Sequence, residues 1–346
     1  MILGESSGYE ITRSLNNNDF ANNIWLIQGL SGCGKSTLCK NLIKGAIQDN
    51  VTAIVIDYSG SYRKKDLPYI NDNNYHIIAL EGLGIDIFKP QNVRIENHVM
   101  REDQNRKAER IYELLCDTLS ITGSSQQGLL YTAVKDELAG ANPSFTGIFD
   151  TISSLPLPAA KTLASKIRIL CELKFTHPLI DWTSVLSSGQ AIVFQFSDIY
   201  EPKRTLQIEM LLTDLWQHVK STANHRNFLL VLDEVQNMRF RGNCFLSHLR
   251  ECRKYGMGVV MATQFLGSKF DKNDAKNLLN QAATKVYFKP DQRNLKNFAQ
   301  SIDECNDTKW IKILQSLQVG ECVYSGMSDQ SKSAQNFILR IPFDVN

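Results

Sequence analysis

Nine consecutive residues near the start of the chain have the types and spacing of a phosphate-binding loop. They fit the pattern G-x-x-x-x-G-K-S/T and are Gly29, Leu30, Ser31, Gly32, Cys33, Gly34, Lys35, Ser36 and Thr37. Glycines let such a loop wrap around phosphate oxygens with its N–H groups pointing inward. The lysine then reaches the β- and γ-phosphates, and the first hydroxyl ligates Mg²⁺. The motif therefore predicts a site for a nucleoside triphosphate and magnesium, with Lys35 on the phosphates and Ser36 on the metal.

Two carboxylates after a later apolar run could complete that site. Asp233 and Glu234 directly follow the run FLLVL at residues 228–232. The carboxyl ends of parallel strands hold the ligand in open α/β sheets, so we expect both side chains to face the phosphate loop. Asp233 is suited to hold Mg²⁺ through water, and Glu234 to orient or deprotonate the water that attacks the γ-phosphorus. The alternative is a helix N-cap with a favourable charge in the first turn.

A third polar residue at a strand end helps to identify the reaction at the predicted nucleotide site. Gln264 follows the apolar run 258–262, and its amide could hydrogen-bond the γ-phosphate or the attacking water. The sequence contains no Asn-Lys-x-Asp guanine-recognition motif, which disfavours a GTPase. The paired acids favour hydrolysis over phosphoryl transfer to a small molecule, because a kinase gains nothing from a strong activator of water.

The elements that must position these residues follow an α/β pattern. Short apolar runs alternate with helical patterns, which predicts a mainly parallel sheet with helices on both faces. The predicted strands lie at residues 24–28, 51–57, 76–80, 191–196, 228–232, 258–262, 285–288, 321–324 and 336–341. Between the third and fourth strands, a charged stretch with apolar residues at helical spacing predicts an all-helical insertion. We expect three parts: 1–90, the first part of the core with a short N-terminal extension; 91–184, the insertion; and 185–346, the second part of the core.

The composition excludes several classes of protein. With 346 residues, 43% hydrophobic and 21% charged, the chain can bury a large core and is not disordered. Its net charge of +2 provides no global basic field for nucleic acid. We expect a cytoplasmic protein without membrane contact, because apolar runs fall short of the roughly 18 residues of a span and the N-terminus lacks a signal-peptide pattern. The eight cysteines form no C-x-x-C pair; Cys244, His248 and Cys252 share a helical spacing, but buried thiols explain them better than zinc.

In order and spacing, three segments resemble the HerA/FtsK branch of RecA-like ring ATPases, which includes DNA translocases and conjugation or secretion motors. These segments are GLSGCGKST, LLVLDEVQNM and LRECRKYGMGVVMATQF. The segment 56–62, IDYSGSY, is also similar to the second-strand motif of HerA-type members. Within the branch, the sequence most resembles the C-terminal ATPase part of the helicase-like subunit of DNA phosphorothioation-dependent restriction systems. HerA-type members usually carry an additional N-terminal β-rich domain, so we expect an excised fragment or a minimal subunit.

The resemblance implies a RecA-like P-loop ATPase that uses ATP and Mg²⁺ and forms a hexameric ring with nucleotide at the subunit interfaces. Each interface site then needs a cation from the neighbouring subunit. Arg253 is the first candidate for this arginine finger and Arg250 the second, because both lie where the family has its RKYG-type segment. The alternative is that both arginines belong to a solvated helix face.

The resemblance also implies duplex DNA as a partner, bound through its phosphates without sequence preference. Candidate contacts are Arg63, Lys64, Lys65, Arg239, Arg241, Lys269 and Lys272. Six copies in a ring would multiply a modest basic patch. Other subunits of the restriction system are further expected partners. Two other functions stay open: a conjugation or type IV secretion ATPase that moves protein or protein–DNA cargo, and an ATP-dependent assembly scaffold with little turnover.

Overall fold

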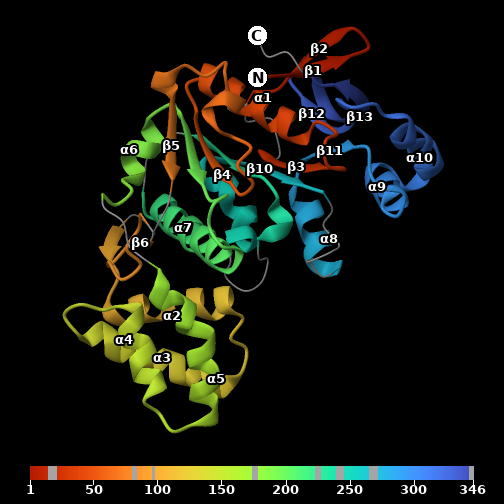
Figure 1. Cartoon of the computed structure of the whole chain (residues 1–346). Coiled ribbons are helices and arrows are strands. Elements are labelled where there is room, and N and C mark those ends of the chain that lie inside the picture. Colours follow the sequence, from red (N-terminus) through yellow and green to blue (C-terminus); the bar gives the residue numbers. More distant parts are fainter. Residues whose placement is uncertain are drawn as a thin grey trace.

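A mixed sheet of eleven strands runs through the described part of the chain (Figure 1). The computed structural model describes residues 1–14, 22–79, 84–95, 98–173, 178–222, 227–238, 245–264 and 272–342. Its parallel strands, in order across the sheet, are β11 (Thr284–Phe288), β3 (Ile24–Gln28), β10 (Met257–Thr263), β9 (Phe228–Leu232), β4 (Thr52–Asp57), β8 (Ala191–Gln195) and β5 (Tyr75–Ala79). Beyond β11 the sheet continues with antiparallel strands β12 (Glu321–Ser328), β13 (Ser331–Arg340), β1 (Ile2–Ser6) and β2 (Tyr9–Thr12).

Helices cover both faces of the parallel strands, which explains their nearly continuous apolar sequences. Successive strand residues point to opposite faces, and in β3 Leu26 joins one hydrophobic cluster while Trp25 joins the other. Helix α1 (Lys35–Gln48) packs on the Trp25 face. Helix α7 (Glu201–Ser221) and the 3-10 helix η5 (Phe245–Tyr255) pack on the opposite face (Figure 1). The predicted mainly parallel sheet with helices on both faces is therefore confirmed.

All nine predicted strands are present, β3 and β9 with the predicted ends and the other seven with shifted ends, and four of the described strands were not predicted. The strand expected at 336–341 begins at Ser331. The missed strands β1 and β2 have only five and four residues and are half polar, so no apolar run marks them. Three further helices follow β10: α8 (Lys272–Gln281), α9 (Leu295–Ile302) and α10 (Asp307–Ser316). Within the described residues, no helix has the length and hydropathy needed to cross a bilayer.

The segment predicted as an all-helical insertion is mostly helical but begins with a hairpin. Its helices are α2 (Gln104–Leu119), α3 (Ser124–Ala139), α4 (Phe145–Ser153), α5 (Pro158–Ile167), the 3-10 helix η3 (Arg168–Glu172) and α6 (Trp182–Ser187). The all-helical prediction is wrong for β6 (Asn92–Ile95) and β7 (His98–Arg101), which pair antiparallel. The helical spacing starts only at α2, whose N-cap Asp103 accepts a hydrogen bond from the Arg106 N–H at 2.9 Å.

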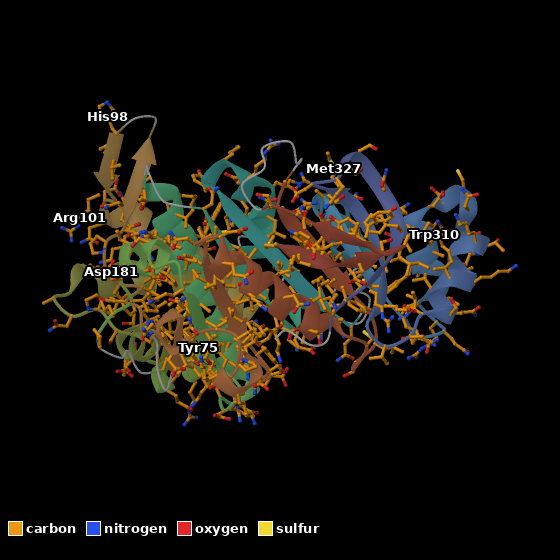
Figure 2. The ribbon with its side chains drawn as sticks, turned by 90° about the horizontal axis from the view of Figure 1, so that it is seen from above. Tyr75, His98, Arg101, Asp181, Trp310 and Met327 are labelled. Atoms are coloured by element: carbon orange, nitrogen blue, oxygen red, sulfur yellow. The ribbon has the colours of Figure 1, made fainter. Side chains whose placement is uncertain are left out.

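The insertion and the C-terminal helices extend the molecule in different directions. Helices α2 to α5 form a bundle beyond α7 (Figure 1), and the hydrophobic cluster on the α7 face of the sheet continues into this bundle. Figure 2 shows the β6–β7 hairpin, with His98 and Arg101, at the opposite end of the molecule from α10 with Trp310. The boundaries at residues 90 and 184 stay predictions.

A buried arginine fixes the N-terminal segment to the edge of the core. The Arg13 guanidinium donates to the Tyr324 hydroxyl at 3.2 Å, to the Met327 carbonyl at 2.7 Å and to the Asn22 carbonyl at 3.1 Å. It also lies over the Trp25 ring, 4.9 Å from the centroid. A buried hydrogen-bond acceptor that loses its charged donor costs free energy of folding. We therefore expect the contacts of Arg13 to stabilise the fold.

We predict that Arg13→Met lowers the free energy of unfolding by about 2–4 kcal/mol, because it keeps the aliphatic stem but removes these donors. Urea denaturation followed by circular dichroism measures the change. The control is Arg293→Met, which alters an exposed arginine. Equal stability of the two variants would contradict the prediction.

Candidate nucleotide-binding site

The phosphate loop occupies the turn between β3 and α1, and two of its glycines are required by space as well as by conformation. Gly29, Gly32 and Gly34 all have positive φ, which side chains disfavour. A Cβ at Gly29 would lie 2.5 Å from the Phe288 Cβ, and one at Gly34 would lie 3.0 Å from the Phe288 ring. Because β11 packs directly behind the loop, only glycine fits at these two positions.

The start of α1 offers positive charge and free N–H groups to an anion. Among the described side chains none caps the N-terminus of α1, and the first N–H groups of a helix have no partners within it. Lys35, only 7% exposed, is the first residue of the helix, and its Nζ donates to the Leu30 carbonyl at 2.8 Å. The ammonium therefore lies folded onto the loop that would surround the phosphates.

The two halves of the predicted site meet at one edge of the sheet. The Ser36 hydroxyl at the start of α1 donates to Asp233 Oδ2 at 3.3 Å, and Asp233 directly follows β9. The other carboxylate oxygen accepts the Glu234 N–H at 2.9 Å. Asp233 is only 5% exposed, and burial raises its pKa, an effect that a hydrogen bond from Tyr62 opposes. The structure thus brings Ser36 and Asp233 together, as the sequence predicts.

The donor set at this edge fits Mg²⁺. A hydroxyl and a carboxylate are hard oxygen ligands, and Mg²⁺ commonly takes one or two protein oxygens and completes its shell with phosphates and water. Within the described residues, no group of three or more His, Cys, Asp or Glu side chains could hold a metal. Cys244 of the weighed zinc spacing lies outside the described residues, and burial raises the pKa of Cys252 to about 12, which disfavours the thiolate ligand.

Glu234 has the backbone strain found at functional positions. Its φ of 58° and ψ of 42° are left-handed, a conformation that non-glycine residues adopt only at a cost. Gln236, in the 3-10 helix η4 (Val235–Asn237), donates its side-chain amide to the Glu234 carboxylate. Glu234 stands at the N-cap position of η4, but its side chain makes no capping hydrogen bond there. The chain turns sharply here and leaves Glu234 partly exposed.

Strand register places Gln264 at the same edge. Thr263, the last residue of β10, pairs with Gln28 of β3, directly before the phosphate loop. On the other side of β10, Met261 pairs with Leu232, directly before Asp233. The exposed Gln264 therefore follows the strand that separates the phosphate loop from the acidic pair. Its backbone position suits contact with a bound phosphate or water.

The candidate arginine fingers lie away from this edge. Arg253 and Arg250 are exposed on η5, which ends just before β10 begins. The Arg253 carbonyl accepts the Gly256 N–H at 3.2 Å, and the Gly256 carbonyl accepts the N–H of Phe228, the first residue of β9, at 3.2 Å. Arg253 is therefore at the amino edge, separated from Asp233 by the length of β9, roughly 16 Å for five residues. The structure does not bring either arginine to Lys35 of its own chain.

The candidate DNA contacts are only partly described. Arg63 and Lys65 are exposed around the 3-10 helix η1 (Lys64–Asp66). Lys64 forms an ion pair with Asp72 at 2.9 Å. Arg63 and Lys65 are therefore the better candidates for phosphate contacts. Outside the described residues lie Arg239, Arg241, Lys269 and the side chain of Lys272.

Sequence reasoning missed two residues that support the site. Asp57, at the end of β4, is fully buried and accepts the N–H groups of Gly60 at 2.8 Å, Ser61 at 3.0 Å and Tyr62 at 3.2 Å. Burial raises the Asp57 pKa against the effect of these three donors. The Tyr62 hydroxyl in turn donates to Asp233 Oδ2 at 2.9 Å. An Asp two residues before Ser-Gly-Ser at a strand end indicates such a turn, but nothing local indicates that Tyr62 reaches Asp233.

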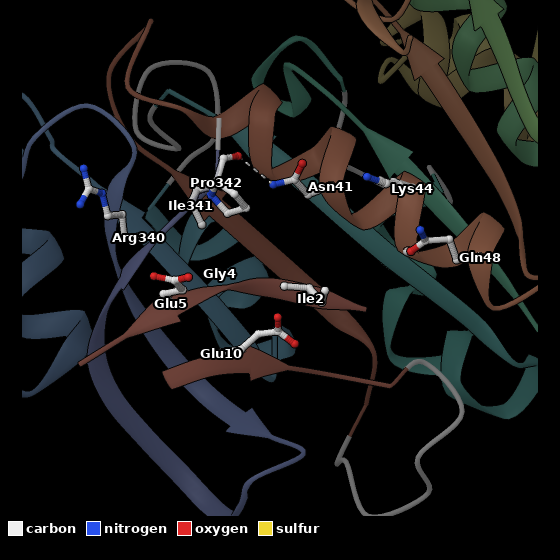
Figure 3. A pocket seen from close by; sticks show the side chains of 11 residues that line it. Ile2, Gly4, Glu5, Glu10, Asn41, Lys44, Gln48, Arg340, Ile341 and Pro342 are labelled. Atoms are coloured by element: carbon white, nitrogen blue, oxygen red, sulfur yellow. Dashed lines mark hydrogen bonds between the residues drawn. The ribbon is translucent and has the colours of Figure 1, made fainter. Parts of the chain in front are cut away.

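A separate cavity of about 530 Å³ lies along the later turns of α1 (Figure 3). Lys44, Gly45 and Gln48 line one side of it, and β1, β2 and the end of β13 line the other. Gly45 follows Lys35 by ten residues, which is about 15 Å along a helix. The cavity therefore does not belong to the phosphate site.

Comparisons with known proteins agree with this geometry. Residues 2–215, more than half of the chain, match the family model described as helicase HerA, central domain. No curated protein matches. The structure of VirB4 from Thermoanaerobacter pseudethanolicus superposes with a TM-score of 0.73 at 15% identity, covering 100% of this chain and 97% of that one.

Conjugative coupling proteins share the same fold. The bacterial conjugative coupling protein TrwBΔN70 gives a TM-score of 0.68 at 14% identity, covering 100% of this chain and 89% of that one. TrwB in complex with ADP and Mg²⁺ gives 0.64 at 14% identity, covering 94% and 86%. At these identities the similarity shows a common RecA-like fold. Together with the family match, which includes the phosphate loop, it identifies this chain as a member of the HerA helicase central-domain family.

Proposed function

We propose that this chain hydrolyses Mg·ATP and uses the cycle to move along or open duplex DNA, as a motor of the HerA/FtsK type. The observation that carries the proposal is the hydrogen bond between Ser36 and Asp233 at 3.3 Å. This contact supports the proposal because it brings the candidate phosphate loop and the candidate metal-holding acid close enough to act on one nucleotide. Family membership and the solved complexes of TrwB with an ATP analogue and with ADP and Mg²⁺ support ATP and magnesium as its ligands.

Each residue at the edge has one task in this proposal. Lys35 and the N–H groups at the start of α1 bind the phosphates, while Ser36 and Asp233 hold the metal. The metal, when bound, offsets the negative charge on the phosphates. Glu234 accepts a proton from water as the water oxygen bonds to the γ-phosphorus, and the bond to the bridging oxygen breaks to leave ADP. Gln264 senses the γ-phosphate.

The proposal includes a ring of subunits. Arg253, with Arg250 as second candidate, lies at the amino edge and is exposed, so it serves a neighbour's nucleotide and not its own. A homo-hexamer supplies one such arginine to every site. Duplex DNA binds through phosphates, with Arg63 and Lys65 as the described contacts. Membership of a phosphorothioation-dependent restriction system rests on the sequence resemblance alone.

A second function has a specific observation in its favour. VirB4 and a conjugative coupling protein superpose on this chain over its whole length, which supports a conjugation or type IV secretion ATPase with protein or protein–DNA cargo. An ATP-dependent scaffold with little turnover uses the same site. The three functions differ in their response to DNA and in the need for Glu234.

We predict that duplex DNA raises the ATPase rate several-fold at low salt and that roughly 0.3 M salt removes this effect, because phosphate contacts weaken steeply with ionic strength. A coupled ATPase assay with and without DNA tests this, and light scattering gives the mass of the same sample. Indifference to DNA, with binding to a membrane-channel component, would favour the secretion ATPase instead.

We predict that Glu234→Gln still binds ATP but turns over about 10²–10⁴-fold more slowly, since only the chemical step loses its base. Lys35→Ala should instead lose nucleotide binding. Binding of a fluorescent ATP analogue and release of phosphate are measured for both variants. A Glu234→Gln variant with wild-type turnover would support the scaffold, and a Lys35→Ala variant with unchanged affinity would remove the phosphate site.

We predict that Arg253→Ala and Lys35→Ala subunits, each inactive alone, recover hydrolysis when mixed. At a mixed interface, an intact phosphate loop meets an intact arginine, which can contribute about 10³–10⁵ in rate. Phosphate release is measured across mixing ratios, with Arg250→Ala mixed in the same way as the comparison. Absence of recovery at every ratio would rule out Arg253 as the finger.

A further inference from the structure

A tyrosine that none of the sequence motifs assigns to the site contacts its metal-holding acid. Tyr62 lies between β4 and η1 and is fully buried. Its hydroxyl donates to Asp233 Oδ2 at 2.9 Å, the same oxygen that accepts the Ser36 hydroxyl at 3.3 Å. Tyr62 and Ser36 therefore hold one carboxylate oxygen from two sides.

The segment that carries Tyr62 is itself fixed. Asp57 accepts three successive N–H groups, ending with that of Tyr62. The Tyr75 hydroxyl donates to the Tyr62 carbonyl at 3.0 Å. Because Ile56 of β4 pairs with Leu232 of β9, Asp57 and Asp233 follow neighbouring strand ends. The sheet therefore places this segment, and hydrogen bonds to the Tyr62 N–H and carbonyl fix the backbone that carries the hydroxyl.

The hydrogen bonds of Asp233 show what the tyrosine contributes. One oxygen accepts the N–H of Glu234 at 2.9 Å, and Glu234 itself has the strained left-handed backbone. The other oxygen relies on Ser36 and Tyr62, and Ser36 is the residue assigned to the metal itself. Since Asp233 is 5% exposed, water has little access to replace a missing donor. Groups behind a metal ligand that orient it commonly contribute 10–100-fold to metal affinity.

We propose that Tyr62 is a positioning residue for the metal site: its hydroxyl holds Asp233 so that Mg²⁺ binds with the nucleotide at low concentration. The proposal deepens the proposed function, because it concerns the same site. If Tyr62 served only to pack its ring, phenylalanine would replace it without effect. A positioning role predicts instead that loss of the hydroxyl changes the Mg²⁺ requirement.

The test is Tyr62→Phe, followed by binding of a fluorescent ATP analogue as Mg²⁺ is varied. We expect the half-saturating Mg²⁺ concentration to rise about 10-fold or more, with unchanged binding when Mg²⁺ is absent. High Mg²⁺ should restore kcat. The matched control is Tyr69→Phe, which also removes a buried hydroxyl; this hydroxyl makes no hydrogen bond within the described residues. An unchanged Mg²⁺ requirement in Tyr62→Phe would overturn the proposal.

A double-mutant cycle with Asp233→Asn separates positioning from a general loss of stability. If Tyr62 acts through Asp233, then Tyr62→Phe should raise the Mg²⁺ requirement only while Asp233 is present. An equal effect of Tyr62→Phe in both backgrounds would overturn the proposal. Because analogue binding needs no hydrolysis, a wild-type protein that binds Mg²⁺ with nucleotide but lacks turnover would contradict the proposed motor and still test Tyr62.

Discussion

One buried carboxylate depends on contacts from two other parts of the sheet edge. Asp233, after β9, accepts hydrogen bonds from Ser36 at the start of α1 and from Tyr62 after β4. Parallel pairing makes this possible, since the carboxyl ends of β3, β9 and β4 all reach one edge. A shift of β4 along β9, or of β3 along β10, would move Tyr62 or Ser36 by about 3.3 Å per residue, which is more than a hydrogen bond tolerates. The register of the sheet therefore determines whether Asp233 keeps both hydrogen bonds.

Strand β11 and the antiparallel strands beyond it support the phosphate loop from behind. Phe288 of β11 fills the space that side chains at Gly29 and Gly34 would need. The Gly320 N–H donates to the Cys33 carbonyl at 3.0 Å, and the Gly320 carbonyl accepts the Ile341 N–H at 2.8 Å. The C-terminal strands therefore connect to the loop through backbone hydrogen bonds. A loop supported in this way is organised before ligand arrives, which lowers the entropy lost on binding.

The insertion is joined to the core by polar contacts as well as by its hydrophobic cluster. Asp214 of α7 accepts the Trp182 indole N–H at 2.7 Å and the Gln91 amide at 2.8 Å. Burial raises the Asp214 pKa while these two donors oppose the rise. Both partners lie near the two ends of the insertion in sequence, so one residue of the core holds both ends. Movements of α7 would therefore reach the insertion directly.

Local sequence patterns determined the phosphate loop, the acidic pair and the nine predicted strands, because a motif of fixed spacing and a run of buried residues are contained within a few neighbours. The same reasoning missed the β6–β7 hairpin, whose strands have only four residues each, and extended the helical insertion over it. Only the tertiary structure decided that Tyr62 contacts Asp233, 171 residues away, and that Arg253 lies at the opposite edge from the nucleotide site. Both facts depend on strand order, which brings distant segments together through pairings that no local pattern encodes.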